Sequence, residues 1–218
     1  MNARTRSAGG FARAENDPPQ ALAGFGHVNR YWDRTRNCHA AKILPGEYYV
    51  TLHDEAITTV LGSCIAACIR DRCTGIGGMN HFLLPGGGQD LAPAPLNAAT
   101  RFGIYAMERL VNDILRNGGI RRNLEAKIFG GGRIIADMSD IGMRNIDFVK
   151  DYVRGEELRL AASDVGDVYP RKVMYFPASG RVFVKKLPSL HNNTILERET
   201  RYLGELTRKP QAGAIELF

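Results

Sequence analysis

A cysteine and a histidine in the first half of the chain have the residue types and surroundings of a nucleophile and its base. Residues 58–64 read T-T-V-L-G-S-C, and His81 follows Cys64 at a distance of seventeen residues, within G-G-M-N-H-F-L-L-P. An imidazole beside a thiol can take the thiol proton and so turn the sulfur into a nucleophile. Gly62 and Ser63, directly before Cys64, offer backbone N–H groups that could form an oxyanion hole.

The segment between the two residues is typical of a β-hairpin, which would bring them together. Residues 65–70 and 76–84 are apolar, and the turn-forming sequence D-R-C-T-G separates them. A turn centred between residues 72 and 73 pairs residues whose numbers sum to about 145, and Cys64 and His81 satisfy that sum. Their Cβ atoms would then lie roughly 4.5–5.5 Å apart. A slip of one residue would move one side chain to the other face.

Taken alone, these residues also fit structural roles. A buried cysteine packs as a small hydrophobic side chain, and a histidine beside F-L-L can be an ordinary core residue. Cys64, Cys68 and Cys73 together could ligate a metal, but they lack the paired C-x-x-C spacing of zinc sites. Gly130 to Gly132 could cradle a phosphate, although neither a G-x-G-x-x-G nor a Walker pattern is present. On the residues alone these alternatives stay open.

The rest of the chain predicts a mixed α/β domain. Ile104, Met107 and Ile114 recur at helical spacing, and Gly118 stands where a helix commonly ends. A second helix is expected to start at Asp140, and further strands are expected at 48–52, 56–61, 124–129, 158–162, 172–176 and 181–186.

The predicted domain covers residues 43–187, between two tails. Residues 1–42 have no sustained period and carry seven basic against three acidic side chains, which predicts a disordered basic arm. Deleting residues 1–40 should therefore leave a folded, active protein. Residues 188–218 are polar, with a terminal helix expected over 196–206.

Composition narrows the class of protein. The 218 residues carry a formal net charge of +6, and no apolar run approaches the roughly 20 residues of a membrane span. We see no secretory signal, and four cysteines do not form a secreted disulfide framework, so a cytoplasmic protein is expected. Lys and Arg do not form the aromatic-interleaved stripe of nucleic-acid binders. A mildly basic face would suit an acidic protein partner.

The sequence from residue 58 to 85, T-T-V-L-G-S-C-I-A-A-C-I-R-D-R-C-T-G-I-G-G-M-N-H-F-L-L-P, closely resembles the signature of the chemoreceptor glutamine deamidases (CheD) of bacterial chemotaxis. The likeness continues through L-E-A-K-I-F-G-G-G (124–132), I-G-M-R-N-I-D-F-V (141–149) and the segment 166–187. It spans about residues 43–187 in order, and both tails lie outside it.

The resemblance implies a fold, an activity and a site. The family fold is a layered α/β/β/α sandwich with mixed β-sheets, similar to that of cytotoxic necrotizing factor-type cysteine deamidases. The family's catalytic cysteine falls on Cys64, its histidine on His81 and its threonine on Thr58, with Gly62 and Ser63 beside the oxyanion. The expected enzyme is a protein-glutamine glutaminase, an amidohydrolase acting on linear amides, in which His81 lowers the pKa of the Cys64 thiol.

The resemblance also implies substrates and partners. The family converts selected glutamines of methyl-accepting chemotaxis receptors to glutamate and releases ammonia, with no metal or organic cofactor. In many species it binds a phosphatase of the CheC type. The alternative is a non-catalytic chemotaxis adaptor that binds receptors or such a phosphatase.

Overall fold

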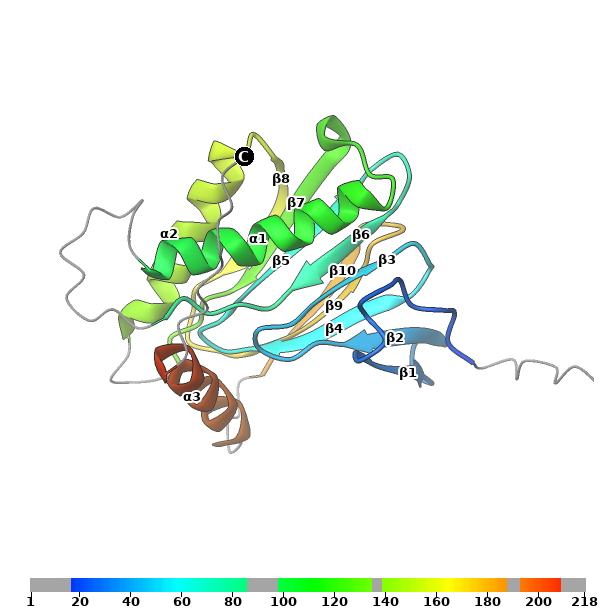
Figure 1. Cartoon of the computed structure of the whole chain (residues 1–218). Helices are drawn as coiled ribbons and strands as arrows, with labels where there is room; N and C mark the ends of the chain where they lie inside the picture. The colour runs from blue at the N-terminus through cyan, green and yellow to red at the C-terminus, as the bar shows by residue number, and fades with distance from the viewer. Residues whose placement is uncertain (1–16, 86–97, 135–138, 188–192, 209–218) are drawn as a thin grey trace, which may run out of the picture.

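The computed structural model of the protein describes residues 17–85, 98–134, 139–187 and 193–208. Within these ranges the chain forms two five-stranded sheets and three α-helices (Figure 1). The first sheet consists, in spatial order, of β1 (Asn29–Asp33), β2 (Cys38–Lys42), β4 (Ala56–Leu61), β9 (Arg171–Phe176) and β10 (Arg181–Lys186). The second consists of β3 (Tyr48–Thr51), β6 (Gly77–Asn80), β5 (Ile65–Asp71), β7 (Leu124–Gly130) and β8 (Arg159–Val165).

Both sheets are mixed, which confirms the expected α/β class. The pairs β2–β4 and β7–β8 are parallel and the other pairs are antiparallel. The helices α1 (Ala98–Arg116) and α2 (Ser139–Gly155) lie on the outer face of the second sheet, and α3 (Asn193–Arg208) lies at one end of the sandwich (Figure 1). The likeness to cytotoxic necrotizing factor-type deamidases stays a prediction.

Burial on both faces explains the apolar sequence of the central strand β5. It lies between the other sheet on one side and α1 and α2 on the other, so a continuous apolar run replaces the alternating pattern of a half-exposed strand. Of the expected apolar stripe of α1, Met107 and Ile114 are fully buried against this sheet, as is Leu110, whereas Ile104 is 39% exposed. The helix ends at Arg116, and Gly118 follows as expected, with a φ of 104° in the left-handed region.

The hairpin β5–β6 is confirmed, but its register differs from the predicted one. Cys68 pairs with Met79, and Ile65 forms a bridge with Phe82, so paired residue numbers sum to 147. The turn is shifted because the Asp71 carboxylate accepts hydrogen bonds from the N–H groups of Cys73 and Thr74 and closes it one residue later than expected. Each residue therefore pairs with a residue two positions further along the partner strand than expected. Because side chains alternate between faces with a period of two, every side chain stays on its expected face.

The N-terminal segment differs from the predicted disordered arm. Residues 29–42 form β1 and β2, and β2 extends the first sheet by parallel pairing with β4. Ala40 and Ala41 are fully buried, and Arg30 forms an ion pair of 2.9 Å with the buried Glu55. These strands consist largely of small and polar residues and gain their stability from pairing with β4, so local patterning does not reveal them. Residues 1–16 lie outside the described ranges.

The pairing of β1 and β2 with the first sheet reverses the expected result of truncation. Deleting residues 1–40 removes β1, most of β2 and the buried side chain of Phe25, and it leaves Glu55 without its cation. We now expect the truncated protein to lose cooperative unfolding or to melt at a much lower temperature, because a buried charge left unpaired costs roughly 3–5 kcal/mol. Thermal melts of the full chain, of this deletion and of a deletion of residues 1–16 as control provide the test. Equal melting temperatures for all three would contradict the assignment.

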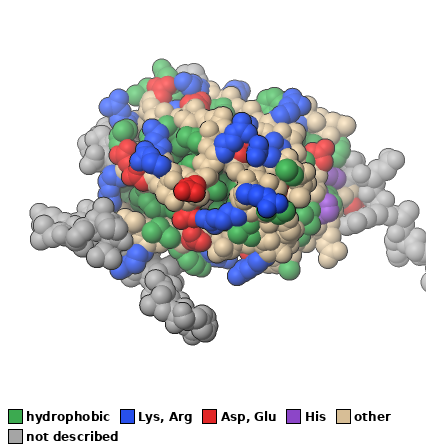
Figure 2. Space-filling view, turned by 90° about the horizontal axis from the view of Figure 1, so that it is seen from above, with side chains coloured by type: hydrophobic (Ala, Val, Ile, Leu, Met, Phe, Trp, Pro, Cys, Tyr) green, Lys and Arg blue, Asp and Glu red, His purple; other side chains and the backbone are tan. Residues whose placement is uncertain are grey.

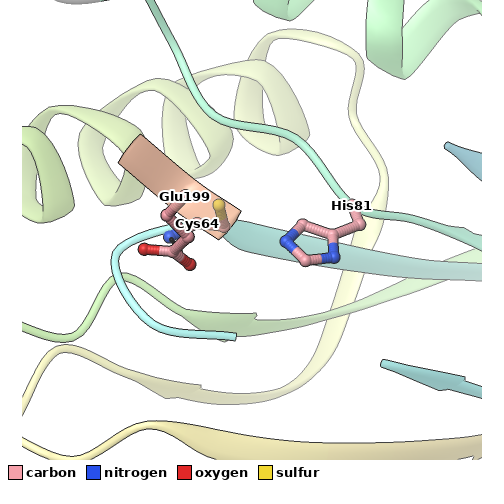
Figure 3. Close-up of side chains that lie close together, drawn as sticks. All are labelled: Cys64, His81 and Glu199. Atoms are coloured by element: carbon pink, nitrogen blue, oxygen red, sulfur yellow. Dashed lines mark hydrogen bonds between the residues drawn. The ribbon is translucent and has the colours of Figure 1, made fainter. Parts of the chain in front are cut away.

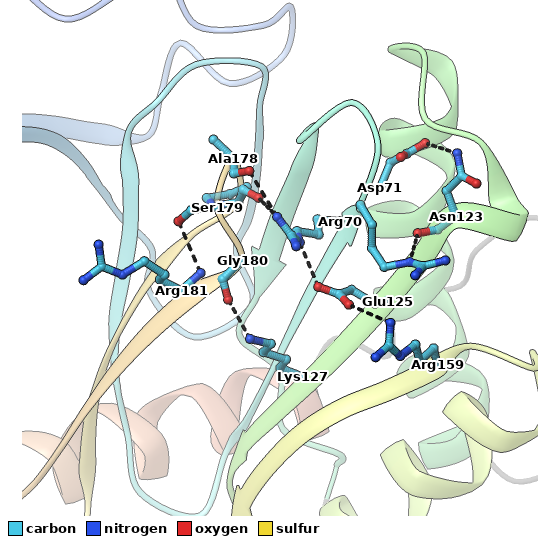
Figure 4. A network of polar contacts seen from close by, with 12 residues as sticks. Arg70, Asp71, Asn123, Glu125, Lys127, Arg159, Ala178, Ser179, Gly180 and Arg181 are labelled. Atoms are coloured by element: carbon cyan, nitrogen blue, oxygen red, sulfur yellow. Dashed lines mark hydrogen bonds and ion pairs between the residues drawn. The ribbon is translucent and has the colours of Figure 1, made fainter.

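Polar contacts join the two sheets at the end away from α3 (Figure 4). Arg70 on β5 pairs with Glu125 at 2.8 Å and donates to the carbonyl of Ala178 in the β9–β10 turn. Lys127 on β7 donates to the carbonyl of Gly180 in the same turn. These contacts hold the turn of one sheet against the face of the other.

Charges of both signs lie on the one face of the molecule that Figure 2 shows. On the face seen from above, Lys and Arg side chains are interspersed with acidic and apolar ones (Figure 2). Among the helices of the described ranges, none combines the length and the apolar character needed to cross a membrane.

Candidate active site

Cys64 lies where the chain passes from one sheet to the other. The strand β4 belongs to the first sheet and β5 to the second, and residues 62–64, here called the oxyanion loop, connect them. The structure brings Cys64 and His81 together and adds a third residue, Glu199 of α3 (Figure 3). The Cys64 sulfur, a His81 ring nitrogen and a Glu199 carboxylate oxygen all lie within 4.8 Å of one another, and all three side chains are buried.

The N–H groups of the oxyanion loop converge on the Glu199 carboxylate. Gly62 and Ser63 donate to its two oxygens at 2.8 Å each, and the Cys64 N–H donates at 3.3 Å. The Ser63 hydroxyl adds a fourth hydrogen bond of 2.7 Å. Converging backbone donors beside a thiol are the arrangement that stabilises the oxyanion of acyl transfer. The N–H groups of Gly62, Ser63 and Cys64 thus face one point beside the Cys64 sulfur, and their role toward an oxyanion stays a prediction.

The donors converge because the carbonyl groups of the same loop are bound on the opposite side. The Gly62 and Cys64 carbonyls accept hydrogen bonds of 2.8 Å from the N–H groups of Gly132 and Gly131. The glycine segment after β7 thus supports the oxyanion loop. Gly130 itself requires glycine, because it has a φ of 112° and a Cβ there would lie 2.1 Å from the Cys64 carbonyl oxygen.

Asn145 on α2, which was not among the site residues expected from the sequence, completes this support. Its amide nitrogen donates to the Ser63 carbonyl at 2.9 Å, and its amide oxygen accepts from the Leu84 N–H at 2.9 Å. The side chain is fully buried. Asn145 therefore ties the oxyanion loop to the segment that follows His81. An asparagine inside an otherwise apolar helix face was the available sequence signal.

The hydrogen bonds of His81 indicate which ring nitrogen carries the lone pair. The Thr59 hydroxyl donates to the Ile43 carbonyl at 2.8 Å and lies 2.7 Å from His81 Nδ1. Since its proton goes to Ile43, the Thr59 oxygen accepts from Nδ1–H, and this network assigns the lone pair to Nε2. Nε2 is buried and has no hydrogen-bond partner among the described residues. It is therefore available to take a proton.

Thr58 lies on the other face of β4 and does not orient His81. Its hydroxyl donates to the Val173 carbonyl at 2.9 Å, in the neighbouring strand β9. Successive side chains of a strand point to opposite faces, so only one of two adjacent threonines can reach the imidazole. The third position that the family resemblance assigned to Thr58 is occupied in this structure by Thr59.

Burial keeps both Cys64 and His81 neutral, and Glu199 reinforces this effect for the thiol but opposes it for the imidazole. Burial raises the pKa of the Cys64 thiol well above its usual value, and the neighbouring Glu199 charge raises it further. Burial lowers the pKa of His81 to about 4, although Glu199 partly opposes that shift. The expected lowering of the thiol pKa by His81 is thus wrong for this arrangement.

A small cavity adjoins the histidine. It has a volume of about 60 Å³ and is lined by His81 and Thr59, and on the α3 side by Ile195, Arg198 and Glu199. That space is large enough for a water molecule, which needs roughly 10–15 Å³ measured in this way. A water here would lie beside the base.

The same three side chains are types that can ligate a metal. The Glu199 oxygens, however, face four hydrogen-bond donors, an arrangement that selects an anion rather than a cation. Cys68, buried on β5, and Cys73, exposed in the turn, do not belong to this group.

Comparison with known proteins gives consistent matches. A family model described as "CheD chemotactic sensory transduction" matches residues 83–186. A protein of Halorhodospira halophila named "Probable chemoreceptor glutamine deamidase CheD" is 52% identical over 213 residues, covering 96% of this chain and 99% of that protein. Proteins with the same name from Methylobacillus flagellatus and Herminiimonas arsenicoxydans are 54% and 55% identical, each over 193 residues, covering 88% of this chain and 95% of theirs.

Proposed function

The chain belongs to the CheD family, and on that premise we propose that it deamidates glutamine side chains of methyl-accepting chemotaxis receptors in the cytoplasm. The product is glutamate, and ammonia is released. The observation that supports this most strongly is the environment of Glu199. The oxyanion loop binds a side-chain carboxylate, the chemical group that deamidation produces, beside the Cys64 sulfur and the available nitrogen of His81.

The first half-reaction forms a thioester. The Cys64 sulfur attacks the carboxamide carbon of the glutamine while His81 Nε2 takes the thiol proton. The carbonyl oxygen becomes an oxyanion and is bound by the N–H groups of the oxyanion loop, where a single donor contributes about 3–4 kcal/mol in a comparable hydrolase. The carbon–nitrogen bond then breaks, and His81 returns the proton to the leaving nitrogen, which departs as ammonia.

The second half-reaction restores the enzyme. A water molecule attacks the thioester carbon while Nε2 takes one of its protons. The second oxyanion binds the same loop and collapses with loss of the sulfur, which recovers its proton from His81. The glutamine has become a glutamate, and neither a metal nor an organic cofactor takes part.

Incubation of the purified chain with the cytoplasmic fragment of a receptor tests this function. We expect ammonia release together with the replacement of NH₂ by OH at specific glutamines, read by peptide mass spectrometry. An adaptor without catalysis would bind the fragment and release no ammonia. Binding without either product would therefore overturn the proposal.

The two adjacent threonines form a matched pair of variants. Thr59→Val removes the acceptor that holds His81 Nδ1–H, and we expect kcat to fall roughly tenfold or more with little change in KM. Thr58→Val removes a hydrogen bond to Val173 on the other face, so kcat should change little. Steady-state deamidation kinetics of both variants decide the assignment. A larger loss in Thr58→Val would restore the residue expected from the family resemblance.

A further inference from the structure

Glu199 stands in the middle of the apolar face of α3. That face consists of half-buried and buried side chains at helical spacing, namely Ile195, Leu196, Tyr202, Leu203 and Leu206. The opposite face carries exposed residues such as Glu197 and Arg201. Glu199 is 2% exposed and is the only charged side chain of α3 that is buried in the described ranges. A carboxylate in such a position is costly unless its surroundings bind it.

The groups that bind Glu199 are the catalytic donors. In the described ranges the other buried glutamates, Glu55 and Glu125, are matched by the cations of Arg30 and Arg70. Glu199 is instead matched by the N–H groups of the oxyanion loop and the Ser63 hydroxyl. A substrate oxygen needs the same donors, so α3 in this position and a bound substrate exclude each other.

Glutamate has the side chain that the reaction produces. Its γ-carboxylate differs from the γ-carboxamide of glutamine only by an oxygen in place of the NH₂ group, at the same distance from the backbone. We propose that α3 is a built-in product mimic that occupies the active site through Glu199 and leaves when a glutamine-bearing segment takes its place. This inference rests on the proposed function for the identity of the displaced substrate.

With α3 in this position, the reactivity of the Cys64 thiol is also lowered. Cys64 is fully buried, and Tyr202 of α3 lies against Gly46, where an added Cβ would be 2.8 Å from the tyrosine ring. The Glu199 charge further raises the pKa of the thiol. Withdrawal of α3 removes both the cover and the charge. The thiol should then be easier to ionise and accessible to reagents.

Alkylation of Cys64 tests this cover without using any substrate. We expect iodoacetamide to label Cys64 slowly in the full chain and about tenfold or more faster in Glu199→Ala, because the variant loses both the charge that opposes ionisation of the thiol and the contacts that hold α3 over it. Glu197→Ala, which removes an exposed glutamate from the same helix, is the matched control and should label at the unaltered rate. The exposed Cys73 provides an internal reference in every sample. Equal Cys64 rates in all three proteins would overturn the proposal.

Deamidation kinetics with the cytoplasmic receptor fragment separate inhibition from catalysis. A tethered competitor raises the apparent KM, because its effective concentration reaches the millimolar range. We expect Glu199→Ala to lower KM severalfold and to leave kcat nearly unchanged. Faster alkylation with a loss of kcat would make Glu199 part of the catalytic machinery and overturn its role as an inhibitor. A third outcome separates the two proposals. If Cys64 becomes accessible in Glu199→Ala but no variant deamidates the fragment, α3 does cover Cys64, whereas the proposed function and the product-mimic role that rests on it are both wrong.

Glu199→Gln offers a direct chemical readout in the full chain. The variant places a carboxamide where the product group stands, so we expect conversion of the introduced glutamine to glutamate, with release of ammonia. The conversion should disappear when Cys64→Ala is added. An introduced glutamine that remains an amide, while Cys64 stays as slow to alkylate as in the unaltered chain, would contradict the assignment.

Discussion

Cys64→Ala should abolish deamidation, lowering the rate by roughly 10⁴-fold or more, because no other group near the oxyanion loop can form the thioester. The fold should survive, since the change removes one small side chain. Cys68→Ala and Cys73→Ala are the matched controls. Cys68 is equally buried but lies on β5 outside the site, and Cys73 is exposed in the turn.

Peptide mass spectrometry of a receptor fragment, with thermal melts of each variant, measures this effect. We expect both control variants to retain most of the activity at any temperature at which they are folded. Conversion of glutamine by a folded Cys64→Ala variant at the unaltered rate would exclude Cys64 as the nucleophile.

His81→Gln should lower kcat by about 10²–10⁴-fold, the usual contribution of a positioned general acid and base. The variant keeps a polar side chain of similar reach but cannot accept and return a proton. His53→Gln, which changes a histidine outside the site that contacts the Gln20 carbonyl, is the control and should retain its activity. Equal activities of the two variants would contradict the role of His81.

The same variant has an expected signature in stability. The pKa of His81 is about 4 in the folded state and about 6.5 in an unfolded chain, so protonation favours unfolding. The contribution of the neutral imidazole, on the order of 3 kcal/mol, is present above pH 6.5 and is lost as the pH falls from about 6.5 to about 4. Over that window the free energy of unfolding should fall more steeply in the unaltered protein than in His81→Gln. Parallel curves in denaturant titrations would contradict the burial of a neutral His81.

Patterns of neighbouring residues predicted the hairpin and the proximity of its two reactive side chains. The apolar runs of β5 and β6 and the turn between them are local features of the sequence. The predicted register was wrong by two residues, an error that leaves every side chain on its correct face. Cys64 and His81 therefore meet although their predicted pairing was not the actual one. The strand β2 escaped prediction because its stability comes from β4, a partner distant in sequence.

The remaining errors in the predicted site concern which residue contacts His81 and which residue contacts the oxyanion loop. Thr58 and Thr59 are equivalent in type, and the choice between them depends on the face of β4 that looks toward His81. Glu199 lies more than a hundred residues from Cys64, in a tail that appeared weakly patterned. Its signal was a single acidic residue at the centre of an apolar helical stripe, but only the tertiary structure shows what that carboxylate contacts.

Hydroxylamine trapping tests the covalent mechanism most directly. Hydroxylamine competes with water for a thioester, so a receptor fragment treated with the enzyme in its presence should carry glutamyl hydroxamate at the same positions that otherwise become glutamate. The hydroxamate should be absent with Cys64→Ala. Undiminished conversion to glutamate without any hydroxamate, or no change at any glutamine, would contradict a Cys64 thioester.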